Sequence, residues 1–179
     1  MALCSLAVAA CGGDDPVSHS SPVGINLKAE SGAVNGTTLS DEKGITTESG
    51  NPFGAFVTAA TNKLGREPGR IEIDKLVLTL GAQSTGVTAL EQVYIGRTEV
   101  LFIMGDTNNT YVVGGVTDPK ATSVDVDVAF ESQDVAEQDW QKFLGGGFKV
   151  VIRGTAATGF ASKGAKADLQ LSFTFAAFE

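Results

Sequence analysis

The stretch KADLQLSFTFAAF, residues Lys166–Phe178, alternates between apolar and mostly polar side chains. Every second position from 169 to 177 is apolar: Leu169, Leu171, Phe173, Phe175 and Ala177. Successive side chains of an extended strand point to opposite faces of a sheet, so this spacing places all of them on one face. The stretch therefore predicts a long closing strand with one buried face.

The stretch SVDVDVAFE, residues 123–131, shows the same period most clearly. We expect one strand here, with its apolar side chains inward and its acidic side chains outward. The inward set is Val124, Val126, Val128 and Phe130, and the outward set is Asp125, Asp127 and Glu131. Asp125 and Asp127 are interpreted as a solvated face that keeps the sheet soluble.

Weaker alternation predicts further strands at 23–27, 70–80, 87–95, 99–104, 111–116 and 148–153. In 70–80 the apolar phase slips between Ile73 and Leu76, which predicts a β-bulge near Asp74-Lys75. Residues 31–50 are rich in Gly, Ser and Thr. They are expected to form a loop with a turn at Asn35-Gly36 and one short strand near 44–48.

Two segments have helical spacing instead. In the first, Asn51 is a suitable N-cap, Pro52 suits the first helical position and Gly65 can end a helix of about three turns. In the second, Ser132 is the expected cap and 145–147, three glycines, the expected end. One face of this helix is apolar and is expected to be buried: Ala136, Trp140, Phe143 and Leu144.

These elements predict a mostly β fold, an antiparallel β-sandwich of seven or eight strands with two short helices. An up-and-down β-barrel is the alternative. Residues 23–179 are expected to form a single domain, since domains cluster near roughly 100–150 residues.

Composition limits the partners of this domain. The formal net charge is -8 and the pI is about 4.6, which argues against nucleic acid and against attraction to an anionic lipid surface. Both cysteines, Cys4 and Cys11, lie in the first eleven residues, so no disulfide can stabilise the domain. Because the negative charge opposes attraction to a lipid surface, any membrane attachment would need a covalent anchor.

The N-terminal residues MALCSLAVAAC form a short apolar segment that ends in small side chains before Cys11. The ending Val8-Ala9-Ala10-Cys11 resembles the lipobox of bacterial lipoproteins. In that family a diacylglycerol is joined to the cysteine sulfur, the signal is removed just before the cysteine, and the new amino terminus is acylated, for example with palmitate. The resemblance covers about the first fifteen residues and implies that Cys11 is the lipidation site.

The resemblance divides the N-terminal part of the chain into two functional segments. Residues 1–10 are the expected signal segment, and since it has no positive charge before its apolar run, we expect its true start upstream. Residues 11–22 are the expected lipidated cysteine and flexible polar tether. In such lipoproteins an Asp directly after the cysteine favours retention in the inner membrane. Here Gly12 follows the cysteine, which favours the outer membrane, with the domain facing either the periplasm or the cell surface.

Few residues outside this segment are suited to chemistry. His19 is the only histidine and lies in the expected tether, so a Ser–His–Asp triad or a His/Cys zinc site is not expected, nor is a cofactor. Asp106, Asn108 and Asp118 are the candidate metal ligands, because alternating oxygen side chains in 106–110 can face calcium. A hairpin turn is the preferred interpretation of 106–110.

The sequence therefore predicts a lipid-anchored protein of the bacterial cell envelope with a non-catalytic structural or binding role. Its expected partner is the membrane, through the lipid; an envelope protein or a polysaccharide is a further candidate partner that the sequence does not identify. The alternative is a carbohydrate- or calcium-binding module, which an exposed Tyr94 or Tyr111 in a concave site, or convergence of the metal candidates, would support. A hydrolase with two facing carboxylates is a third hypothesis.

Overall fold

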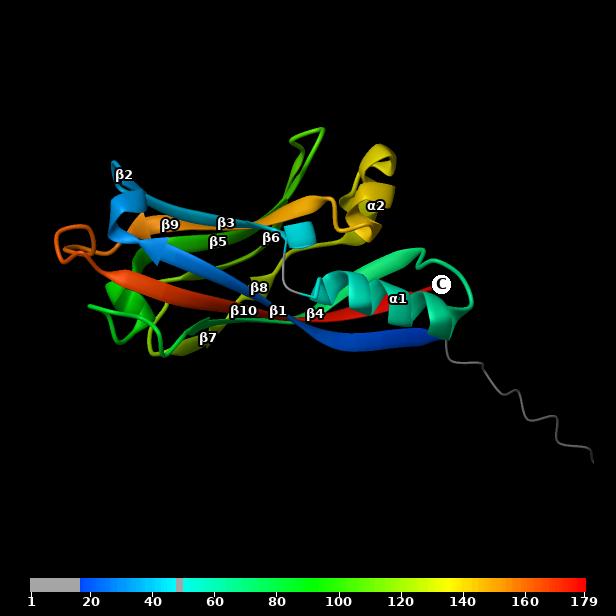
Figure 1. The fold of residues 1–179 in the computed structure, drawn as a ribbon, viewed down its shortest axis with the longest axis horizontal. Coiled ribbons are helices and arrows are strands. Elements are labelled where there is room, and N and C mark those ends of the chain that lie inside the picture. The colour runs from blue at the N-terminus through cyan, green and yellow to red at the C-terminus, as the bar shows by residue number, and fades with distance from the viewer. Residues whose placement is uncertain (1–16, 48–49) are drawn as a thin grey trace, which may run out of the picture.

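Two antiparallel sheets packed face to face form the core of the computed structural model, which describes residues 17–47 and 50–179 (Figure 1). The expected signal segment, Cys11 and the first part of the expected tether lie outside the described residues. The strands are β1 Ser18–Glu30, β2 Val34–Asn35, β3 Thr38–Gly44, β4 Arg70–Leu80, β5 Tyr94–Met104, β6 Thr110–Thr117, β7 Ser123–Asp125, β8 Asp127–Val128, β9 Phe148–Ala156 and β10 Lys166–Phe178. The helices are α1 Pro52–Leu64 and α2 Glu137–Leu144, with 3₁₀ turns at Ser31–Ala33, Ile45–Thr47, Leu90–Gln92 and Ser132–Asp134.

The first sheet has the order β1-β10-β4-β7 and the second β2-β3-β9-β5-β6-β8. The sheets do not close into a barrel, so the sandwich prediction is confirmed and the barrel alternative is wrong. More strands form than the seven or eight expected, because two-residue strands such as β2 leave no periodic signal in the sequence.

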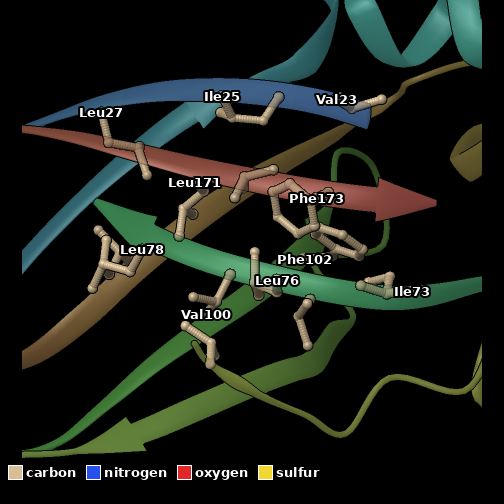
Figure 2. Close-up of a cluster of buried hydrophobic side chains, with 14 of the residues drawn as sticks. Val23, Ile25, Leu27, Ile73, Leu76, Leu78, Val100, Phe102, Leu171 and Phe173 are labelled. Atoms are coloured by element: carbon tan, nitrogen blue, oxygen red, sulfur yellow. The ribbon is translucent and has the colours of Figure 1, made fainter. Parts of the chain in front are cut away.

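Strand β10 is central to the first sheet and pairs with both β1 and β4. Its predicted inward residues are all buried, from Leu169 to Ala177. Across the three strands they form apolar rows, of which Ile25, Leu171 and Leu78 make one. Figure 2 shows these rows facing Val100 and Phe102 of β5 in the second sheet.

The bulge predicted in β4 is confirmed. Ile73 pairs with Phe175 and Lys75 pairs with Thr174, which leaves Asp74 without an opposite residue. The extra residue restores the phase, so that both halves of β4 direct apolar side chains into the core.

The single strand expected at 123–131 is wrong, because the chain changes sheets within it. Ser123–Asp125 pairs with β4 in the first sheet, and Asp127–Val128 pairs with β6 in the second. Val126 bridges the two and is buried, whereas Val128 is 36% exposed instead of inward. Phe130 is buried as expected, and Asp125 and Asp127 are exposed as expected. The crossing closes one side of the sandwich.

The strand expected near 44–48 is also wrong: β3 occupies Thr38–Gly44 instead, after the confirmed turn that follows Asn35. Periodicity missed β3 because Asp41 takes an inward-facing position two residues after buried Leu39. The Asp41 carboxylate accepts a hydrogen bond of 2.7 Å from the backbone N–H of Lys28 in β1. This contact ties the two sheets together on the side opposite Val126.

The strand expected at 87–95 is wrong for most of its length: residues 87–93 form a loop that contains the 3₁₀ turn Leu90–Gln92, and strand begins only at Tyr94. Its apolar residues Val87, Leu90 and Val93 are buried from this loop, at a spacing of three residues instead of the two of a strand. The hairpin expected from 99–104 and 111–116 is confirmed.

Strand β1 begins at Ser18, so residues 18–22 belong to the sheet and not to the tether, whose expected boundary is wrong. His19 lies in this strand, and its ring stacks on Phe56 of α1 with centroids 5.9 Å apart. Pro22 is accommodated because β1 is an edge strand.

Helix α1 is as predicted: the Asn51 side chain accepts a hydrogen bond of 3.0 Å from the backbone N–H of Gly54, and Gly65 ends the helix with a positive φ of 74°. Helix α2 begins later than expected, at Glu137, and Ser132 is not its cap. The Ser132 hydroxyl instead accepts a hydrogen bond of 3.2 Å from the N–H of Ile71. The three glycines end α2 as predicted.

A cluster of phenylalanines joins the helices to both sheets. The Phe53 ring of α1 lies 5.2 Å from the rings of Phe143 in α2, Phe148 in β9 and Phe175 in β10. Phe53 is only 1% exposed. From α1 it thus contacts α2 and a strand of each sheet, and we call these rings the phenylalanine cluster.

Replacing Phe53 with Ala should therefore lower the free energy of unfolding by about 3–5 kcal/mol, because a large buried ring is lost and four elements lose a shared contact. Urea denaturation measures the change. Val112→Ala is the control, since Val112 is 45% exposed and should change stability by less than about 0.5 kcal/mol. Equal losses in the two variants would contradict the central place of Phe53.

Candidate functional site

One end of the sandwich, which we call the helical end, carries α1, α2, the start of β1 and the C-terminus (Figure 1). Strand register places Ser18, Phe178 and Arg70 in one row across the first sheet at this end. The loops 81–93, 118–122 and 157–165 lie at the opposite end together with the segment 31–37, which includes β2, and we call this end the loop end (Figure 1).

A groove of about 750 Å³ lies at the helical end, between the start of β4 and the segment that leads into α2. Its walls include Arg70, Gln133, Val135, Glu137, Trp140 and Gln141, and we call it the Trp140 groove. A second hollow of about 400 Å³ shares Arg70, Ser132 and Gln133 with it and adds Glu72 and Glu131. The two hollows are therefore neighbours along β4.

Trp140 does not lie on a fully buried face, contrary to the sequence prediction. Its ring packs on Phe143 with centroids 5.7 Å apart and is half-buried, and its remaining surface lines the groove. The helical spacing that predicted burial is correct for Phe143 and Leu144. α2 is only eight residues long and caps the end of the sandwich, so one edge of its apolar face meets solvent.

Polar side chains around the groove contact one another. Arg70 forms an ion pair with Glu72, and its guanidinium lies 4.1 Å from the centre of the Phe178 ring. The Gln133 amide donates to the carboxylate of Glu131, and the Gln141 amide donates to Glu67 at 3.4 Å.

A buried carboxylate fixes the position of α2. Asp139, in the first turn, is fully buried and accepts hydrogen bonds from Thr107 at 2.8 Å, Asn109 at 2.7 Å and Tyr111 at 2.8 Å. The Tyr111 hydroxyl in turn accepts a hydrogen bond of 3.1 Å from the N–H of Ala136. Burial alone would raise the pKa of Asp139, but the three hydrogen bonds and the charge of Lys142 outweigh it and keep that pKa below its usual value.

Sequence reasoning missed Asp139, because an acidic residue in a first helical turn is ordinarily a solvated partner of the helix dipole. The available signal was the run of hydrogen-bond donors at Thr107, Asn109 and Tyr111, which overlaps the segment 106–110 that the sequence offered for calcium. Thr107 and Asn109 lie in the β5–β6 hairpin turn and Tyr111 is the second residue of β6, and all three bind the helix instead.

The three candidate metal ligands do not converge. Asp106 is exposed and pairs with Lys142 at 3.3 Å, and Asn108 has the positive φ of a turn residue, 55°. Asp118 follows the far end of β6, a strand of eight residues that spans roughly 26 Å and separates it from the hairpin turn with the other two. There its carboxylate accepts a hydrogen bond of 2.7 Å from the N–H of Gly96. Within 17–47 and 50–179, no three His, Cys, Asp or Glu side chains are grouped to bind a metal ion.

The tyrosines proposed for a concave site are also unsuited to it. Tyr94 is fully buried, and Tyr111 uses its hydroxyl on Asp139 and Ala136. The half-buried Trp140 instead lines the Trp140 groove.

Comparison with known proteins identifies no relative: no family model, no curated protein and no solved structure matches this chain. None of the helices in the described part of the chain has the length and apolar character needed to cross a membrane.

Changing Asp139 to Asn should lower the urea midpoint at pH 7, because three donors lose a charged acceptor. Since the pKa of Asp139 is lower when folded than unfolded, its contribution is present above its ordinary value of 3.8 and is lost as the pH falls through the folded pKa. The variant should therefore lose less stability than the parent between pH 5 and pH 3. Asp134→Asn, an exposed neighbour, is the control; identical pH profiles for the parent and Asp139→Asn would contradict the network.

Removal of the hydroxyl should lower the free energy of unfolding at one tyrosine but not at the other. Tyr111→Phe should cost about 1.5–3 kcal/mol of unfolding free energy, because it breaks a hydrogen bond to a carboxylate. Tyr94→Phe should be neutral within about 0.5 kcal/mol or stabilising, because the Tyr94 hydroxyl is buried without a hydrogen-bond partner among the described residues. Burial, with a smaller contribution from Asp41, raises the pKa of Tyr94 well above its usual value. Thermal unfolding measures both, and a larger loss for Tyr94→Phe would refute this assignment.

Proposed function

We propose that this chain is a lipid-anchored bacterial cell-envelope protein whose sandwich has a non-catalytic binding role. The observation that carries the proposal is the sequence Val8-Ala9-Ala10-Cys11, which resembles a lipobox and lies outside the described residues. Acyl chains on Cys11 would give stable attachment, since each buried CH₂ contributes about 0.8 kcal/mol. Attachment by lipid also suits a chain of net charge -8, which an anionic membrane surface repels.

The anchor and the fold together imply an orientation. Cys11 precedes the first residue of β1, Ser18, by seven positions, which span at most about 25 Å when fully extended. The anchor would thus hold the helical end towards the membrane and the loop end away from it. Gly12 after the cysteine favours the outer membrane, as argued from the resemblance.

Two features support a non-catalytic role. The only histidine, His19, packs on Phe56, and its Nε2 is buried without a partner among the described residues. In the hollow beside the groove, the carboxylates of Glu72 and Glu131 accept from Arg70 and Gln133 respectively. Each carboxylate is thereby engaged with a neighbouring donor.

One observation favours the carbohydrate form of the alternative function over its calcium form. The half-buried Trp140 ring lines a groove with polar side chains around it, whereas the metal candidates lie apart. A carbohydrate-binding module displayed on the lipid anchor is therefore the second candidate function.

The anchor is tested by paired cysteine substitutions in the protein expressed from its own gene. Cys11→Ser should move the protein from the detergent phase to the aqueous phase on detergent partition, because the sulfur that accepts the lipid is lost. Cys4→Ser should partition as the parent does, since residue 4 leaves with the signal.

Mass spectrometry of the parent should find an acylated Cys11 at the mature N-terminus. An unmodified segment 1–11, or a Cys11→Ser variant that stays in the detergent phase, would contradict the anchor.

A further inference from the structure

We propose that the Trp140 groove binds a short segment of neutral glycan, with the Trp140 ring as the surface on which a sugar ring stacks. The inference deepens the binding role proposed above and gives its ligand class. It does not depend on the lipid anchor, because every residue it uses belongs to the folded domain.

The choice of Trp140 follows from how the other aromatic rings are used. Nine of the ten phenylalanines are buried, and the tenth, Phe178, is covered by the guanidinium of Arg70. Trp140 is the only tryptophan, and the core takes only part of its ring, at Phe143. An aromatic ring with part of its surface left in a groove suits a ligand with an apolar face and polar edges, which describes a pyranose ring.

The polar walls of the groove match the edges of such a ring. Gln133 and Gln141 carry amides that donate and accept, and Glu137 carries an acceptor carboxylate. Sugar hydroxyls both donate and accept, so they can pair with all three side chains. The amides of Gln133 and Gln141 already contact Glu131 and Glu67, which limits the entropy lost on binding.

Charge selects a neutral ligand. Glu137 lines the groove, Glu72 and Glu131 line the adjoining hollow, and the protein as a whole is acidic, so an anionic polysaccharide would be repelled. Arg70 stands between the two hollows and would repel a cationic group placed on the Trp140 ring.

The size of the groove is also suitable. Its volume of about 750 Å³ falls in the range of small-ligand sites, about 300–1,000 Å³. The adjoining hollow extends it along β4, so a chain of sugar units could continue from the Trp140 ring towards Glu72 and Glu131.

The single tryptophan provides the experiment. The full-length protein is titrated with hexasaccharides of glucose, mannose, galactose and N-acetylglucosamine, with polygalacturonate as the anionic comparison, while Trp140 emission is recorded. At least one neutral hexasaccharide should shift or quench the emission with a Kd between micromolar and millimolar, confirmed by calorimetry. Polygalacturonate should bind at least tenfold more weakly.

Variants then assign the binding to the groove. Trp140→Ala should weaken binding at least tenfold by calorimetry, and Trp140→Phe, which keeps a ring, should weaken it less. Gln133→Ala should weaken it several-fold, whereas Gln83→Ala, an exposed glutamine at the loop end, should leave it unchanged. Circular dichroism checks that each variant is folded, and Gln133→Ala keeps the test valid if Trp140→Ala does not fold.

Four results would overturn the proposal: no binding of any neutral hexasaccharide, unchanged affinity in both Trp140→Ala and Gln133→Ala, tighter binding of polygalacturonate, or cleavage of the bound glycan. None of these bears on the partition of Cys11→Ser, so failure of the glycan site and failure of the anchor are told apart.

Discussion

The packing of Phe53 against rings from α2, β9 and β10 is the contact on which the rest of the structure depends. No cysteine occurs after residue 11, so the domain has no disulfide, and burial of apolar side chains must supply its stability. Along most of the sandwich the two sheets bury each other. At the helical end the phenylalanine cluster takes over this role, and it thereby fixes both helices on the sheets.

The proposed site inherits its geometry from this packing. Trp140 is placed by Phe143 on one side of α2, while Asp139 joins the start of the same helix to the β5–β6 hairpin. The groove is thus built from a helix fixed by apolar and polar contacts and from the start of β4, which belongs to the central part of the first sheet. A tether at Ser18 and a groove at Arg70 would lie in the same row of strands, so anchor and ligand site would share one end of the molecule.

Sequence reasoning succeeded where one face of an element is buried and the other is wet. It predicted β10 to its observed bounds, the bulge at Asp74 and the caps of α1, because each depends on local spacing or turn chemistry. It failed where tertiary contacts decide the outcome. Alternation in 123–131 cannot reveal that Val126 passes between sheets, and the polar Asp41 conceals strand β3. Likewise, nothing in local spacing distinguishes the buried carboxylate of Asp139 from a solvated one, or shows that a short helix leaves Trp140 at a groove.

Amide hydrogen exchange, followed residue by residue, tests most directly whether the phenylalanine cluster unites the helices with the sheets. The most protected amides of α1 and α2 should open with the same free energy as those in the centre of β10, because unlocking either helix requires the shared aromatic core to open. If both helices exchange through local openings while β10 stays protected, the helices are only loosely attached and the account of the helical end is wrong.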